Sequence, residues 1–166
     1  MKKLLVLFTA ILISGAAMAQ MIPMANELPA PFKGGNAAMK VFFRDSLQVT
    51  PSIQKAKASG MVIFKFTADA KGNLSKMVVY YADDIVLTEP VIDALKRTSG
   101  KWVIPVDHKF YDFIIPFSIN YKPGATPKPA ALKAVLDFAQ SKKPIVAADQ
   151  VPLNAATLLP TVIINY

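Results

Sequence analysis

The stretch from Phe110 to Tyr121 places the strongest constraint on the fold. Its odd-numbered positions from 111 onward are large and apolar, and its even-numbered positions are mostly polar, with Ile114 as the exception. This period of two predicts a β-strand with one buried face. Pro116 has no N–H to donate to a ladder, so its place within the run predicts a strand at a sheet edge. Another chain can add a strand to such an edge.

The first 19 residues have the three parts of a secretory signal peptide. Two lysines follow Met1, an apolar run extends from Leu4 to Ile13, and Ala17-Met18-Ala19 forms a small-x-small cleavage site. We therefore expect cleavage after Ala19 and export to the periplasm. The alternative is an uncleaved inner-membrane anchor, but even when it is counted through Ala19 the apolar run has only about 16 residues, fewer than the ~20 that a spanning helix needs.

Composition limits how the exported chain can be held together and what it can bind. The chain has 166 residues, 53% of them hydrophobic, and no cysteine, so burial of apolar side chains must stabilise the fold without disulfides. Loss of Lys2 and Lys3 lowers the formal charge from +8 to +6. The remaining lysines are scattered along the sequence, which favours a solvated basic surface over a nucleic-acid site.

The next hundred residues predict an extended lead-in at 20–33 and a domain at 34–121. Apolar residues recur at helical spacing after Gly34-Gly35, with Asn36 as a plausible N-cap and an end before Pro51. The polar, lysine-rich residues 52–59 predict no element.

Two strands, a helix and a third strand follow. Residues 61–68 and 74–81 alternate as strands and flank the turn cluster 69–73, which predicts a hairpin. A helix is predicted from Thr88. With the strand at 110–121, these elements predict an α+β fold with a three-stranded antiparallel sheet and helices on one face.

Residues 122–166 form a C-terminal extension with a linker, a helix and a possible strand. The helix is predicted from Pro129 with one apolar stripe, made of Leu132, Val135, Leu136 and Ala139. The closing stretch Leu158–Tyr166 resembles Ile114–Tyr121, since both contain two aliphatic residues, a proline, alternation and a final Asn-Tyr. This similarity predicts a second edge strand.

The sequence offers little for catalysis. His108 is the only histidine and lies in a charged loop, which favours a solvated side chain. Asp83 and Asp84 are adjacent and precede a helix, so we interpret them as complementing the helix dipole. Phosphate loops, nucleophile elbows and zincin motifs are absent. Trp102, Met61, Met77, Phe64 and Phe66 are expected to be core residues. We therefore expect no catalytic residue, cofactor or metal, and no enzyme.

Several short motifs occur together in a recognisable order. They include a Gly-x-Val strand from Gly60, the Asp-x-x-Gly turn at Asp69, the Trp-x-x-Pro step at Trp102 and the final strand with Ile115-Pro116-Phe117. In this order they resemble the C-terminal domain of TonB-type energy-transducing proteins in the form common among Bacteroidetes-like sequences. The resemblance spans about 90 residues.

The resemblance implies a periplasmic ββαβ domain that binds a segment of an outer-membrane transporter by strand addition. The implied contact surface is the edge of the last strand, with the protein-binding residues Tyr111, Phe113, Ile115, Pro116, Phe117, Ile119 and Tyr121. Pro116 should leave one ladder bond unmade with any added strand. TonB-dependent transport is the process that the resemblance implies, with a transporter or another envelope protein as the partner.

Two features depart from a complete energy transducer. The anchor looks cleavable, and the spacer of about 15 residues spans only about 45 Å as polyproline II. The extension at 122–166 also follows the strand that should be free. One alternative is therefore a self-complemented or dimerising structural envelope protein whose C-terminal segment covers this edge. Another is a motor-coupled transducer with an uncleaved N-terminus.

Overall fold

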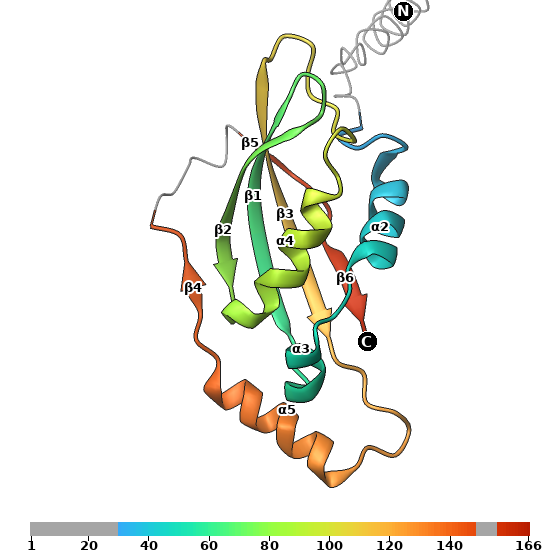
Figure 1. Ribbon diagram of the computed structural model, residues 1–166, viewed down its shortest axis with the longest axis vertical. Coiled ribbons are helices and arrows are strands. Elements are labelled where there is room, and N and C mark those ends of the chain that lie inside the picture. Colours follow the sequence, from blue (N-terminus) through green and yellow to red (C-terminus); the bar gives the residue numbers. More distant parts are fainter. Residues whose placement is uncertain (1–29, 149–155) are drawn as a thin grey trace, which may run out of the picture.

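The computed structural model describes residues 30–148 and 156–166 (Figure 1). The predicted signal peptide and most of the lead-in lie outside the described residues. In chain order the elements are α2 (Gly35–Ser46), α3 (Pro51–Ala56), β1 (Gly60–Asp69), β2 (Leu74–Ala82), the 3-10 helix η1 (Ile85–Leu87), α4 (Thr88–Lys96), β3 (Phe110–Asn120), α5 (Pro129–Ser141), β4 (Ile145–Val146), β5 (Ala156–Leu158) and β6 (Val162–Asn165). The fold is mixed α+β, as predicted.

Strands β1 and β2 form the predicted antiparallel hairpin. Its turn is closed by the side chain of Asp69, which accepts hydrogen bonds from the backbone N–H groups of Lys71 and Asn73 at 2.9 and 2.8 Å. Gly72 has φ 83° in this turn, a left-handed conformation that glycine adopts without a Cβ clash. The turn residues therefore fix the hairpin as the sequence predicts.

The sheet is larger than the three strands predicted. Its order is β4-β2-β1-β3-β5, and β6 also pairs with β3. β3 pairs antiparallel with β1 on one side and parallel with β5 and β6 on the other. The prediction of β3 as an edge strand is therefore wrong: the C-terminal extension supplies strands to the same sheet and places β3 inside it.

The core lies between the sheet and helices α2 and α4, which pack against one of its faces (Figure 1). Phe43 of α2 contacts Phe117 of β3 edge to face, with ring centroids 5.0 Å apart. Trp102 is buried with its ring 4.4 Å from that of Phe66, and its indole N–H donates to Thr98 Oγ1. The core assignment is confirmed for Trp102, Phe64 and Phe66, whereas Met61 is exposed.

Local predictions about two early helices need correction. The N-cap of α2 is Gly34, with φ 88°, because the helix begins one residue before Asn36. Residues 51–56 form the short helix α3, which the polar composition did not predict. Thr50 caps it by accepting from the Ile53 N–H, and Pro51 occupies its first turn. Ile53 is its single buried side chain.

Helix α5 does not bury the predicted apolar stripe. Leu132 and Leu136 are 47% and 60% exposed, and Phe138 is the buried residue of the helix. The predicted spacing was helical, but α5 lies at the periphery beside α3 rather than across the sheet (Figure 1). A peripheral helix can bury only a narrow strip of its surface, so periodicity alone did not identify the buried positions.

Candidate functional site: the covered edge of strand β3

The predicted binding residues divide into two groups in the structure. Phe113, Ile115, Phe117 and Ile119 are buried in the core, whereas Tyr111, Pro116 and Tyr121 are half-buried. The side chains of the first group face the helices and cannot contact a partner in this fold. Any strand added to β3 must therefore bind through its backbone, and a protein-binding edge from Tyr111 to Tyr121 stays a prediction.

The even-numbered positions of β3 direct their backbone groups away from β1. The Ile114 carbonyl accepts from the Leu159 N–H at 2.8 Å, and the Asn120 carbonyl accepts from the Tyr166 N–H at 3.1 Å. Lys122 continues the ladder by donating its N–H to the Tyr166 carbonyl at 2.9 Å. Peptide groups alternate along a strand, so Pro116 shares this side and its missing N–H faces the same neighbour.

The neighbouring segment is interrupted opposite Pro116. Ile114 aligns with Leu158 of β5, and Phe117 aligns with Val162 of β6. Two residues of β3 therefore face three residues of the segment, Leu159 to Thr161. The break falls where β3 has no donor to offer, so the proline and the break match each other.

We call residues Ala156–Tyr166 the C-terminal cover. Its inward residues Leu159, Val162 and Ile164 are buried, and Ile164 is only 4% exposed. Its outward residue Ile163 is 61% exposed. The burial alternates along β6, which is therefore a half-buried strand, and the inward residues of the cover extend the core of the sheet.

Two tyrosines hold the ends of the cover. Tyr111 and Thr157 share a hydrogen bond of 2.9 Å between their hydroxyl groups. At the other end, the Tyr166 hydroxyl lies 2.8 Å from the Ala58 carbonyl oxygen and 3.1 Å from that of Ile53. Burial raises the pKa of Tyr166 to about 12, and the nearby Tyr121 hydroxyl adds to the shift.

The sequence similarity between the two stretches corresponds to physical pairing. Asn120 aligns with Asn165 in the parallel ladder, and the rings of Tyr121 and Tyr166 lie 5.7 Å apart. The repeated pattern therefore pairs with itself, with one extra residue at the interruption. This similarity was the sequence signal for the cover, and the pairing of β6 with β3 is the intramolecular arrangement that the self-complemented alternative describes.

Packing of the cover is incomplete near its interruption. A cavity of about 220 Å³ lies there, lined by residues that include Tyr111 and Phe113 of β3 and Leu158 and Pro160 of the cover. The edge of β3 is thus covered by two short strands, β5 and β6, and a cavity remains beside the end of β5.

A partly buried ion pair lies on the face of the sheet opposite the helices. Lys65 Nζ is 2.7 Å from Asp112 Oδ2, and Thr67 donates to Asp112 Oδ1 at 2.6 Å. Burial raises the pKa of Asp112, but the hydrogen bonds from Lys65 and Thr67 outweigh it, and the net pKa lies below its usual value. The pair fixes β1 against β3, the strand that carries the cover.

The remaining sequence candidates are dispersed. His108 is exposed, with its ring 5.2 Å from that of Tyr111. Asp83 accepts from the Met61 N–H and from Tyr81, whereas Asp84 caps η1 through the Val86 N–H. The two carboxylates thus serve different backbone sites. Among residues 30–148 and 156–166, no group of three acidic, histidine or cysteine side chains is arranged to hold a metal.

No family model, curated protein or solved structure matches this chain. In the part of the chain that the structure describes, every helix is too short or too polar to cross a membrane.

Proposed function

We propose that this chain is a non-enzymatic protein-binding module of the periplasm, of the kind found in the C-terminal domains of TonB-type energy transducers. Its partner is an extended segment of an outer-membrane transporter or another envelope protein, which adds to the sheet along β3. The observation that supports this proposal is the pairing of β3 with β5 and β6. The edge of β3 accepts extended chain, and in this structure the chain itself supplies it.

Strand addition fits the distribution of groups at this edge. Main-chain hydrogen bonds provide affinity in this binding mode without a fixed side-chain sequence. The cover makes only three aligned pairs through β5 and four through β6, separated by the break at Pro116. A partner segment that runs along β3 must displace these pairs, so the cover competes with the partner for one edge.

The proposal can be tested by weakening the cover at one position. Ile164 faces inward and Ile163 faces outward, so Ile164→Asp should loosen β6 and Ile163→Asp should not. The probes are a synthetic peptide with the sequence Leu158–Tyr166 and peptides from the periplasmic N-termini of transporters encoded in the same genome. We expect Ile164→Asp to bind transporter peptides at least tenfold more tightly than Ile163→Asp, by fluorescence anisotropy.

The outcome that overturns the proposal is specific. If Ile164→Asp keeps its far-UV spectrum and binds the Leu158–Tyr166 peptide but no transporter peptide, the edge is open and has no such partner. Should Ile164→Asp not fold, Tyr166→Phe gives a milder opening of the same segment. With that variant, unchanged affinity for transporter peptides despite faster amide exchange in β6 also argues against the proposal.

A second candidate function is a self-complemented structural protein of the envelope. It is favoured by the contacts of Tyr166, whose hydroxyl lies within hydrogen-bond distance of the Ile53 and Ala58 carbonyl oxygens outside the sheet. Under this proposal the cover never leaves β3, or it exchanges between two copies to form a dimer. Light scattering of wild type and Ile164→Asp would detect exchange as a concentration-dependent dimer, and a monomer with permanently protected β3 amides would support a purely structural role.

A further inference from the structure

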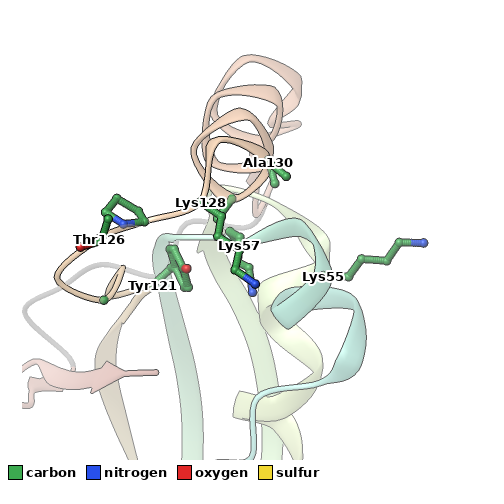
Figure 2. A pocket seen from close by; sticks show the side chains of 10 residues that line it. Lys55, Lys57, Tyr121, Thr126, Lys128 and Ala130 are labelled. Carbon is green, nitrogen blue, oxygen red and sulfur yellow. The ribbon is translucent and has the colours of Figure 1, made fainter.

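A cavity lies between the end of α3, the start of α5 and the segment that follows β3 (Figure 2). Its volume is about 510 Å³, within the range of small-molecule sites. The cavity adjoins the end of β3 through Tyr121, whose ring also packs 5.7 Å from that of Tyr166, but no residue of β3 itself (Phe110–Asn120) lines it.

The lining of this cavity is basic. Lys55 and Lys57 come from α3 and its C-cap, and Lys128 precedes α5. The two sequence segments that supply the lining, within 46–68 and 113–136, contain no aspartate or glutamate. Within residues 30–148 and 156–166, none of these three lysines forms an ion pair, unlike Lys65, Lys133 and Lys142. The cavity therefore concentrates uncompensated positive charge.

Lys57 is held in place by the backbone. It is the C-cap of α3 with φ 51°, and its N–H points at the Gln54 and Ile53 carbonyls. Glycine or asparagine is favoured at a left-handed position after a helix. The left-handed conformation of Lys57 therefore costs conformational free energy, and it directs the side chain so that the ammonium group lies at the cavity. Its Nζ lies 4.9 Å from the centre of the Tyr121 ring.

Helix dipoles explain only part of this charge. Lys55 and Lys57 lie at the C-terminal end of α3, where a cation is favourable, and Figure 2 shows Lys55 directed away from Tyr121. Lys128 is the N-cap of α5, where a cation opposes the dipole, and the first turn of α5 contains no acid. An anion in the cavity would offset the repulsion at Lys128 and also face the ammonium group of Lys57.

The rest of the wall is small and apolar. Pro127, Ala131 and Ala134 line the cavity beside the ring of Tyr121, and Thr126 adds a hydroxyl group. We infer that this lysine pocket binds a small anionic molecule through a phosphate or carboxylate group held by Lys57 and Lys128. The apolar or planar portion of the bound molecule lies against Tyr121, Ala131 and Ala134.

The test uses the exported chain labelled with ¹⁵N, and phenyl phosphate and inorganic phosphate as probes. We expect saturable amide shifts at 55–57 and 121–134 with phenyl phosphate, weaker binding of inorganic phosphate, and loss of both at high salt. The double variant Lys57→Gln/Lys128→Gln should lower the affinity for phenyl phosphate at least about tenfold. The control Lys40→Gln/Lys96→Gln removes the same charge from exposed lysines outside the pocket and should bind within about twofold of wild type.

Two results would overturn the inference. One is that the amide shifts caused by phenyl phosphate do not saturate, or that the two double variants lower the affinity equally. Either outcome would show only a general attraction of anions to a basic surface. The other is binding to phosphatidylglycerol vesicles, by co-sedimentation, without any shift from phenyl phosphate, which would assign the lysines to a lipid surface. Neither result bears on peptide binding by β3, so this inference and the proposed function can fail separately.

Discussion

The hydroxyl group of Tyr166 lies 2.8 Å from the carbonyl oxygen of Ala58, a residue 108 positions earlier in the sequence. This contact joins the end of the C-terminal cover to the segment between α3 and β1. The backbone of Tyr166 also completes the ladder with Asn120 and Lys122. One residue therefore fixes both the position of the cover along β3 and its attachment to the body of the protein.

Tyr166→Phe should loosen the cover without unfolding the protein. The variant keeps the ring and removes the O–H donor, which leaves the Ala58 carbonyl without this partner and costs about 0.5–1.5 kcal/mol. Hydrogen exchange followed by mass spectrometry should show faster exchange in 162–166. As a control, Tyr81→Phe removes a hydroxyl that donates to Asp83; Tyr81 lies in β2, which is separated from β3 by β1. Equal exchange in 162–166 for the two variants would contradict the anchoring role.

Alkaline pH should release the cover through the same hydroxyl. The pKa of Tyr166 is raised from 10.0 to about 12, chiefly by burial. Its contribution to stability is complete below about pH 10 and is lost as the pH rises through about 12. Absorbance titration of tyrosinate should show a late-titrating group that is missing in Tyr166→Phe. A titration curve in which the two proteins differ only near pH 10 would contradict this prediction.

The position of β3 in the sheet illustrates what the sequence can predict. Its period of two identified the strand to within one residue, and the Asp-x-x-Gly turn identified the hairpin before it. Pro116 led to the wrong conclusion that β3 is an edge strand. A missing N–H requires only that the neighbouring strand accept no hydrogen bond at that point. An edge exposed to solvent meets this requirement, and so does the break between Leu158 and Val162.

The lysine pocket shows a different limit. Lysines that are scattered in the sequence come together because α3 and the segment after β3 meet in space. Helix α3 was itself not predicted, since its six residues, of which only Ile53 is buried, give too short a pattern for periodicity. Charge clustering of this kind depends on tertiary contacts, so local sequence patterns could not reveal the pocket.

Acid should destabilise the sheet through Asp112. The pKa of this carboxyl is lowered because the hydrogen bonds from Lys65 and Thr67 outweigh burial. Its contribution to stability is present above its unfolded value of about 3.8 and is lost as the pH falls through the lower folded value. Urea unfolding at a series of pH values should show the free energy of unfolding falling below about pH 4, with a smaller fall in Asp112→Asn.

At neutral pH the same variant should be clearly less stable. Asp112→Asn leaves Lys65, a largely buried lysine, without its carboxylate partner, and we expect a loss of about 1–3 kcal/mol. Asp137→Asn is the matched control, because it breaks an exposed i,i+4 pair with Lys133 that is worth at most about 0.5 kcal/mol. Similar losses in the two variants would show that the pair across β1 and β3 has no special role.

Gly72→Ala should weaken the hairpin turn for two separable reasons. Gly72 has φ 83°, which costs an alanine about 1 kcal/mol or more, and its added Cβ would overlap the carbonyl oxygen of Trp102. The Gly72 carbonyl also accepts from the Gly100 N–H at 2.8 Å, so a shift of the turn would disturb the segment that leads to Trp102. We expect a loss of about 2–4 kcal/mol in urea unfolding, with reduced near-UV circular dichroism from the single tryptophan.

Gly124→Ala is the control for this substitution. Gly124 has no heavy atom within 4 Å of a built Cβ and no left-handed φ, so alanine there should be neutral or should stabilise the protein by up to about 1 kcal/mol. The comparison separates the local demand at Gly72 from the general effect of replacing glycine. Equal stabilities for the two variants would mean that the turn tolerates a side chain, and that its close approach to Trp102 does not determine the register of β1 and β2.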